Sequence, residues 1–165
     1  MLDLTVAQVA GLTELAIREK IDRMEQALGA LAEEGLPAVE LPLKHTFTDG
    51  IYIREIVIPA DTLLVGKIHR HAHLNYITKG KVTVLTKAGL QTLEGPCSMI
   101  SEAGTKRALY THTDTIWTTV HANPSNITDT DELEKDIITV DYSPFPLLQG
   151  EDQQLIGVLI CPTQQ

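Results

Sequence analysis

The chain is short of several features that mark common classes of protein. Only two of its 165 residues are cysteines, Cys97 and Cys161, and they stand far apart with no paired framework around them. The longest apolar run near the end, residues 155–160, is far shorter than the roughly 20 residues that a membrane helix needs. No basic segment followed by an apolar one opens the chain. These absences predict a soluble, non-secreted protein with no membrane partner, in a reducing cytoplasm.

Positive charge is also scarce, because 13 Lys and Arg residues stand against 22 Asp and Glu residues and give a formal net charge of -9. A nucleic-acid surface needs a cluster of cations to meet the phosphates, and here the cations are scattered along the chain. We therefore expect no nucleic-acid partner. The length suits one domain with its own hydrophobic core and attached segments, rather than two domains.

The first segment, residues 5–34, is rich in Ala, Leu, Glu and Gln and has no proline, which predicts a helix. Thr5 and Gln8 are spaced as a capping box, and residues 35–37 (Gly-Leu-Pro) mark its end. Apolar residues at alternating steps of four and three form one stripe, namely Ile17, Ile21, Met24, Leu28 and Leu31. This stripe either packs on its own domain or forms a short coiled-coil seam between subunits.

From about residue 46 to residue 122 the pattern changes to short segments rich in Val, Ile, Thr and Tyr, with turn residues about every ten positions. That spacing predicts a sandwich or barrel of strands. The predicted strands are 51–58, 63–69, 75–78, 81–86, 97–101, 107–110 and 115–121. A short capped helix is expected at 128–136, and residues 154–161 suit an edge strand on the barrel or on a neighbouring subunit.

Three of the six histidines, His69, His71 and His73, fall within five residues at the end of an apolar segment. Alternate residues of a strand point to one face, so the three imidazoles can converge on one point and bind a divalent metal ion. In a second interpretation they line a polar pocket mouth and hydrogen-bond one another and water. In a third, His71 faces solvent, because strand alternation fails wherever the chain bends.

Other side chains in the same region carry alternative interpretations. His112 and His121, on the last predicted hairpin, are interpreted as surface histidines, and the alternative is that either supplies an extra metal ligand if the barrel folds it inward. Trp117, the single tryptophan, is either a core residue or a stacking wall for a ligand. Arg107 is either an anion clamp or the partner of Glu102.

These residues resemble the motifs of the cupin superfamily, the RmlC-like jelly-roll class. If Gly80 is the closing glycine of the first motif, His73 stands at the glutamate position and His69 at the second histidine position, with Lys67 at the first. A second alignment makes His69 and His71 the His-x-His pair and leaves Asn75 near the glutamate position. Both alignments keep His69 as a ligand.

The second cupin motif resembles the sequence around Gly104, where Arg107 stands at the histidine position and Thr111 at the asparagine position. The segments 52–56, 66–69 and 104–107 are also similar to uncharacterised cupin-like proteins of tailed bacteriophages. The resemblance implies a mainly β fold, a single cupin-type jelly-roll β-barrel with an N-terminal α-helical segment and a C-terminal extension containing a short helix. The expected divisions are 1–45, a helical segment suited to oligomerisation, 46–123, the barrel, and 124–165, the extension.

The leading functional interpretation is a phage-type cupin, an accessory structural or ligand-binding protein in a homo-oligomeric assembly. Its expected metal ligands are His69, His71 and His73, and the cofactor is a divalent transition metal such as Zn, Fe, Ni or Mn. A small anionic ligand is expected at four further residues, which are Lys67, Arg107, Trp117 and Tyr76. No catalytic residue is assigned.

Two alternatives stay open. One is a small metal-dependent enzyme, an isomerase or dioxygenase, in which Arg107 holds an anionic substrate beside the metal. The other is a phage protein that sequesters a small anionic signalling molecule of the host. Expected partners are further copies of the chain and other virion proteins, and the expected location is the host bacterial cytoplasm or the phage virion.

Overall fold

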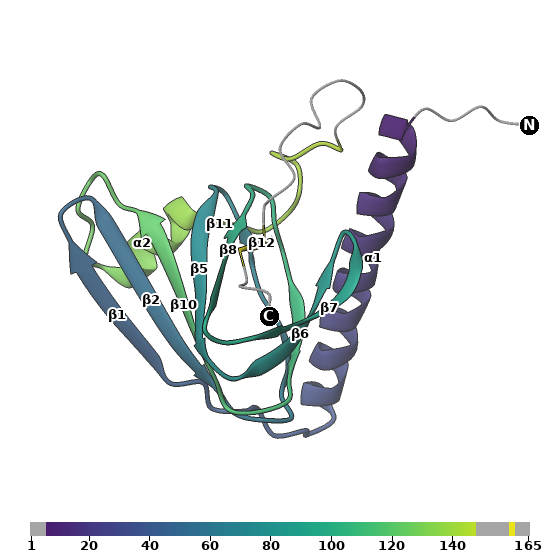
Figure 1. Cartoon of the computed structure of the whole chain (residues 1–165), viewed down its shortest axis with the longest axis horizontal. Coiled ribbons are helices and arrows are strands. Elements are labelled where there is room, and N and C mark those ends of the chain that lie inside the picture. Colours follow the sequence, from purple (N-terminus) through teal and green to yellow (C-terminus); the bar gives the residue numbers. More distant parts are fainter. Residues whose placement is uncertain (1–5, 148–158, 161–165) are drawn as a thin grey trace, which may run out of the picture.

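The computed structural model describes residues 6–147 and 159–160, and its described part is mainly β, with antiparallel strands in two facing sheets (Figure 1). The larger sheet has six strands in the order β1 (Leu43–Thr48), β2 (Ile51–Ile58), β10 (Thr115–Ala122), β5 (His73–Lys79), β8 (Cys97–Ser101) and β12 (Leu159–Ile160). The smaller sheet has four in the order β3 (Leu63–Val65), β9 (Ala108–Thr111), β6 (Lys81–Thr86) and β7 (Gly89–Glu94). A third pairing joins β11 (Ile138–Thr139) to β4 (Ile68–His69).

The hydrophobic core lies between the two sheets because strand residues alternate between buried and more exposed positions. The alternation is clearest in β10, in which every second residue from Thr115 to His121 is buried. Side chains from both sheets meet in this core, which contains Ile56, Ile58, Ile77, Val82, Val84, Leu93, Cys97, Met99, Leu109 and Trp117. The sheets are therefore held together by burial of apolar surface, the main favourable term in folding.

The predicted mainly β fold, with an N-terminal helix and a short helix near the C-terminal end, is confirmed. Three strands have the predicted bounds, 51–58, 81–86 and 97–101. The predicted strand 63–69 is instead two strands, β3 and β4, because the Gly66 amide donates to the Arg107 carbonyl and the chain then leaves the four-stranded sheet to pair with β11.

Apart from the two-residue β11, two longer strands, β1 and β7, were not predicted from the sequence. Both are edge strands, and most of their residues are exposed or only partly buried. Polar residues therefore replace the apolar alternation that marks a strand buried on one face. The edge position of β7 also leaves Leu90 exposed, at 75%.

Gly80 connects the two sheets, since it stands between β5 of the six-stranded sheet and β6 of the four-stranded sheet. Its φ is 104°, a conformation that residues with a side chain rarely adopt. A Cβ atom there would lie 2.6 Å from the Asp114 carbonyl oxygen and 2.6 Å from the Thr115 Cα. Both the turn and the close approach of backbone therefore require glycine.

The N-terminal helix α1 (Val6–Glu33) ends as predicted at Gly35, whose φ is 97°, and the Leu36 amide donates to the Leu31 carbonyl at 2.9 Å. The expected cap at Thr5 lies outside the described residues. Ile21 of the apolar stripe is only 1% exposed, so the helix packs on its own chain, beside the four-stranded sheet (Figure 1). A coiled-coil seam between subunits stays a prediction.

The short helix α2 (Thr130–Ile137) begins two residues into the predicted range, after the cap residue Asp129. The Asp129 carboxylate accepts hydrogen bonds from two backbone amides of the first turn, at 3.0 and 2.9 Å. Leu133 and Ile137 are buried against Tyr52 of β2. The helix thus covers one end of the space between the sheets.

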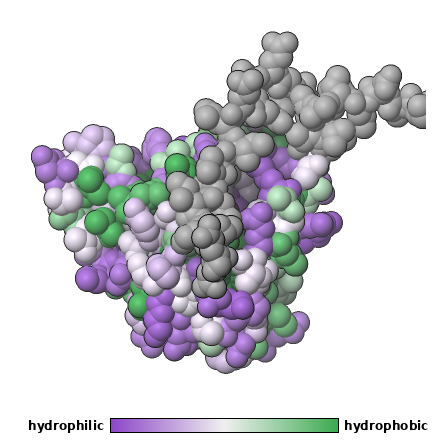
Figure 2. Space-filling view, viewed as in Figure 1, coloured by the Kyte–Doolittle hydropathy of each residue, from purple (hydrophilic) through white to green (hydrophobic). Residues whose placement is uncertain are grey.

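Of the edge strand predicted at 154–161, the described residues are those of β12, which pairs antiparallel with β8 at the edge of the six-stranded sheet. The outer face of that sheet carries a row of apolar residues brought side by side by the strand register, namely Ile53, Val120, Leu74 and Ile100. In Figure 2, hydrophobic atoms gather on the part of the surface where β2 and β10 lie in Figure 1. None of the helices in the described ranges is long and apolar enough to cross a membrane.

We predict that Lys106→Met loosens α1, because the Lys106 ammonium is 7% exposed and bonds Asp22 at 2.9 Å and Glu25 at 2.6 Å on the helix. Water can reach the carboxylates of Asp22 and Glu25, which are 42% and 56% exposed, so the cost is that of two lost hydrogen bonds, about 1–2 kcal/mol in the free energy of unfolding. Urea unfolding and amide exchange in α1 measure it. Lys81→Met, which removes a 3.8 Å exposed ion pair to Glu94, is the control and should change stability by less than about 1 kcal/mol. Equal effects of the two substitutions would contradict this role of Lys106.

Candidate functional site

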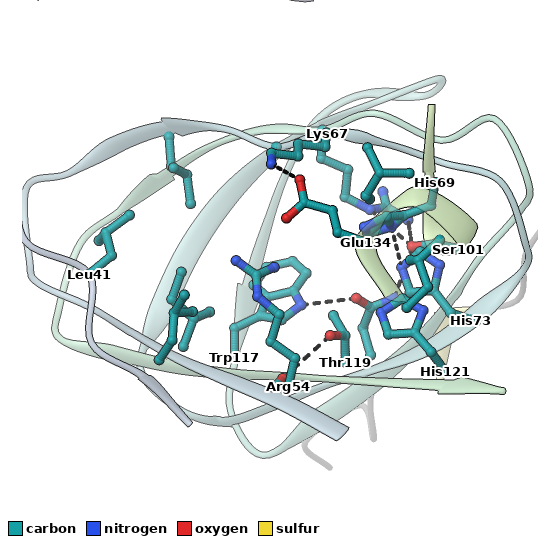
Figure 3. Close-up of a pocket in the computed structure, with 18 of the residues that line it drawn as sticks. Leu41, Arg54, Lys67, His69, His73, Ser101, Trp117, Thr119, His121 and Glu134 are labelled. Atoms are coloured by element: carbon teal, nitrogen blue, oxygen red, sulfur yellow. Dashed lines mark hydrogen bonds and ion pairs between the residues drawn. The ribbon is translucent and has the colours of Figure 1, made fainter. Parts of the chain in front are cut away.

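A cavity of about 500 Å³ opens between the sheets, with α2 at one side. Figure 3 shows Leu41 at one end of it and the histidines at the other. The apolar part of the lining includes Leu41, Ile56, Ile58, Leu64, Leu109 and Trp117. The polar part includes Arg54, His69, His73, Asn75, Ser101, Arg107 and His121. This combination of an apolar wall and a few convergent polar groups is typical of small-molecule sites.

Three imidazoles meet at the polar end of the cavity, and each comes from a different strand. His69 lies on β4, His73 on β5 and His121 on β10. Their ring centroids are 4.1 Å apart for His69 and His73, 5.2 Å for His69 and His121, and 4.7 Å for His73 and His121. His73 and His121 are each only 6% exposed. Strands of two different sheets therefore bring three imidazoles together in a largely buried place.

The hydrogen bonds fix the tautomer of His73. Its Nδ1 lies 3.1 Å from the His71 carbonyl oxygen, which can only accept, so Nδ1 carries the proton. The other nitrogen, Nε2, is then an unprotonated acceptor and takes a hydrogen bond from His69 Nδ1 at 3.0 Å. A backbone carbonyl that holds one nitrogen of an imidazole while the other faces a cavity is the usual arrangement of metal-binding histidines.

Burial keeps the three imidazoles neutral. Desolvation, followed by the charges of His73 and His121, lowers the pKa of His69 to about 2. Desolvation, again the largest cause, lowers the pKa of His121 to about 3, with His73 and Arg54 adding to the effect. The pKa of His73 is also lowered by burial, although its bond to the His71 carbonyl acts in the opposite direction. Neutral imidazole is the form that binds metal ions.

Of the three histidines predicted as ligands, the structure brings together His69 and His73. The His71 side chain is exposed and does not line the cavity, and only its backbone carbonyl contributes, to His73. The bend after β4 turns this residue outward, as one of the sequence interpretations allowed. His121 is buried beside the other two, so the favoured interpretation as a surface histidine was wrong, and its inward position is the one that the alternative interpretation allowed.

The signal that could have identified His121 is its spacing from Trp117. The two residues are four apart on one strand, so they share a face, and the tryptophan is in the core. The ring of Tyr52, on β2, stacks on the His121 ring at a centroid distance of 5.9 Å. The Tyr52 hydroxyl in turn pairs with His45 Nδ1 at 2.7 Å.

Of the four residues predicted to bind an anion, three line the cavity and one does not. Arg107 and Trp117 line the cavity, and so does Lys67, but the exposed Lys67 ammonium is ion-paired with Glu134 of α2. Figure 3 shows this pair at one side of the cavity. Tyr76 is 41% exposed and is not among the residues that line the cavity.

A chain of hydrogen bonds runs from the core to Arg107. Trp117 Nε1 donates to Asn75 Oδ1 at 3.0 Å, and Asn75 Nδ2 donates to Ser101 Oγ at 2.9 Å. Arg107 Nη2 donates to the same hydroxyl at 2.9 Å and Nε at 3.3 Å. Trp117 is therefore both a core residue and part of the cavity wall, and Arg107 pairs with Ser101, not with Glu102.

Arg54 is a cavity residue that the sequence interpretation missed. It lies on β2 between Tyr52 and Ile56, which are both buried, so strand alternation places all three on the inner face. Figure 3 shows Arg54 directed into the cavity. Its charge contributes to the lowered pKa values of His69 and His121.

The donor atoms are close but are not yet arranged around a single point. Across residues 6–147 and 159–160, no group of three or more His, Cys, Asp or Glu side chains could hold a metal ion as the side chains stand. His69 and His73 instead share a hydrogen bond. The site as described is thus a cluster of neutral imidazoles that hydrogen-bond one another.

Comparisons with known proteins give similarity in structure only. No protein-family profile and no curated protein sequence matches the chain. Among solved structures, a Vibrio cholerae transcriptional regulator of the HTH_3 family is similar at a TM-score of 0.43 and 13% identity over 51% of this chain, and the match spans about half (51%) of the regulator.

Two other solved structures are similar to a comparable degree. An RmlC-like cupin from Shewanella frigidimarina has a TM-score of 0.45 and 15% identity, covering 55% of this chain and 80% of its own. Salicylate 1,2-dioxygenase from Pseudoaminobacter salicylatoxidans, in adducts with gentisate, has a TM-score of 0.47 and 15% identity, covering 72% of this chain and 34% of its own. Similarity at this level assigns neither a family nor an activity.

We predict that the metal-free protein loses stability as the pH falls below about 6.5, the ordinary pKa of histidine. Below this pH the buried histidines are protonated in the unfolded chain but stay neutral in the folded chain. The free energy of unfolding therefore falls by up to about 1.4 kcal/mol per pH unit for each buried imidazole. The loss continues toward the folded pKa values. Urea unfolding in a chelator between pH 7.5 and 5 measures the slope. His121→Gln should make the slope shallower, and an unchanged slope would show that His121 is not held neutral by burial.

Proposed function

We propose that the chain is a cupin-type jelly-roll protein whose cavity binds a divalent transition metal ion through His69, His73 and His121, with a small anionic ligand beside it. The observation that carries the proposal is the meeting of three neutral imidazoles from three strands in one cavity. Keeping three histidines uncharged costs stability at acidic pH. A cluster of this kind is more often a functional site than a structural one.

The chemistry of the donor set suits Zn, Fe, Ni or Mn. Two nitrogen ligands of one tetrahedral zinc ion stand about 3.3 Å apart, given metal–nitrogen distances of about 2.0–2.1 Å. His69 Nδ1 and His73 Nε2 are already 3.0 Å apart, held by a hydrogen bond that a metal ion would replace. His73 presents an unprotonated Nε2, and small rotations of the other two rings would complete the set.

The positive charge of Arg107 opposes a metal ion by Coulomb repulsion, since it already lowers the pKa values of His69 and His73. An anion bound between the two would remove that repulsion. The metal and the anion would therefore bind more tightly together than separately, which is why the proposal includes both.

A metal-dependent enzyme of the isomerase or dioxygenase type, acting on an anionic small molecule, is the second candidate. The favouring observation is the ligand count, because three histidines leave coordination positions open in a cavity of about 500 Å³. A bound ion would supply a Lewis acid there, and the residues of this chain would bind and orient the substrate. Sequestration of a small anionic host molecule uses the same cavity without catalysis.

The assembly belongs to the proposal as well. The sequence resemblance supports the division into 1–45, 46–123 and 124–165, the bacteriophage relationship and the place in a virion. The homo-oligomer is supported in addition by exposed apolar residues of α1, namely Leu15 at 40% and Leu31 at 44%. Light scattering of the full chain tests the homo-oligomer. A monomer at all concentrations would contradict it.

We predict that the chelated protein binds close to one equivalent of Zn²⁺, measured by calorimetry at pH 7.5. His73→Gln and His121→Gln should each weaken binding by more than the roughly 10–100-fold typical of an outer-shell partner, because each removes a ligand. His71→Gln is the matched control and should bind as the wild type does, since only its backbone carbonyl takes part.

Two outcomes would contradict the proposed site. Less than about a tenth of an equivalent of bound metal, an order-of-magnitude threshold, would leave no metal site to assign. Equal losses in His71→Gln and His121→Gln would show that the three imidazoles of the cavity are not the ligands.

A further inference from the structure

The geometry points to a more specific ligand for the cavity. We propose that it takes a small organic carboxylate with an apolar body, and that the guanidinium groups of Arg54 and Arg107 hold the carboxylate. This inference rests on the proposed function in one respect, since it names the class of anion for the same cavity. Arg54 has no counterpart among the residues that the sequence resemblance assigned.

Arg107 has unused hydrogen-bonding capacity in a partly buried place. Burial lowers the pKa of its guanidinium, and no other cause contributes. A guanidinium has five N–H donors, and the two donors with a partner here both go to the Ser101 hydroxyl. Within the described residues no carboxylate forms an ion pair with it. Its remaining donors are free to bind an anion, which a buried cation needs.

Arg54 supplies the second charge. Its backbone carbonyl accepts a hydrogen bond from Thr119 Oγ1 at 3.3 Å, which fixes the strand, while the side chain enters the cavity (Figure 3). None of the hydrogen bonds and ion pairs in the described part of the chain uses its guanidinium. Two arginines without carboxylate partners in one cavity form a site for a charge of the opposite sign.

The remaining charged groups of the lining lie toward α2. Asp131 and Glu134 are on that helix, both are exposed, and Glu134 is paired with Lys67. The neutral histidines contribute no charge at pH 7. The lining thus has three cations, Arg54, Lys67 and Arg107, against two carboxylates, so its net charge is positive, and away from α2 the only charged groups of the described lining are Arg54 and Arg107.

The rest of the cavity lining indicates what kind of group is attached to the carboxylate of the ligand. Beyond the arginines the wall consists largely of apolar side chains, including Leu41, Ile56, Leu64, Leu109 and Trp117. A phosphorylated sugar would leave its hydroxyl groups facing this wall without partners, at an energetic cost. An aromatic or branched aliphatic carboxylate would bury its apolar part there instead, and about 500 Å³ leaves room for one.

The single tryptophan, Trp117, lines the cavity and makes binding visible by its fluorescence. We would titrate the chelated full-length protein with benzoate, with the neutral isostere benzamide and with inorganic phosphate. The variants are Arg54→Gln and Arg107→Gln, and the control is Arg23→Gln on the exposed side of α1. Circular dichroism checks that each variant is folded.

The expected result is that benzoate binds the wild type at least about tenfold more tightly than benzamide or phosphate does. Each cavity variant should weaken benzoate binding about 10–100-fold, the effect of losing one charge-assisted hydrogen bond, and Arg23→Gln should not change it. The comparison of benzoate with benzamide needs only the wild type, so it decides the matter even if Arg107→Gln does not fold.

Three results would overturn the inference. They are equal binding of benzoate and benzamide, phosphate binding as tight as that of benzoate, and benzoate binding that requires zinc, which would assign the carboxylate to the metal and not to the arginines. The benzoate titration is done in a chelator, so its result does not depend on a metal ion. A protein that binds benzoate in this titration but binds no zinc in the calorimetry would contradict the metal site and leave this inference standing.

Discussion

The pairing of β10 on both of its edges is the constraint on which the cavity depends. This strand lies between β2 and β5, and its register places Trp117 beside Ile56 and Ile77, and His121 beside Tyr52. Side chains alternate, so a slip of one residue would turn the tryptophan and the histidine outward together. The same pairing that buries the core therefore positions one imidazole of the cluster and one wall of the cavity.

The polar groups of the cavity depend on one another. The buried charge of Arg107 helps to keep His69 and His73 neutral, and the Ser101 hydroxyl that orients Arg107 is held by Asn75, which is held by Trp117. Such a network of buried polar groups does little for stability. Two arginines without carboxylate partners beside three uncharged imidazoles leave positive charge in the cavity, which the proposed anion would balance.

Local pattern was enough to predict the mainly β fold, three strands to the residue and the end of α1 at Gly35, because hydrophobic alternation and turn residues act over short distances. It was not enough for the edge strands β1 and β7, which bury too little to show alternation. His71 and His121 show the limit for the site. Neighbours in sequence suggested His71, whereas the third imidazole comes from a strand some fifty residues away, and its only local signal is its phase relative to Trp117.

The central claim is that His121, together with His69 and His73, surrounds a metal ion. X-ray absorption at the zinc edge of protein loaded with one equivalent of Zn²⁺ tests it directly, because imidazole ligands give a distinct scattering pattern at metal–nitrogen distances of about 2.0–2.1 Å. The account predicts three imidazoles in the wild type and in His71→Gln, and two in His121→Gln. A spectrum of His121→Gln identical to that of the wild type would contradict it.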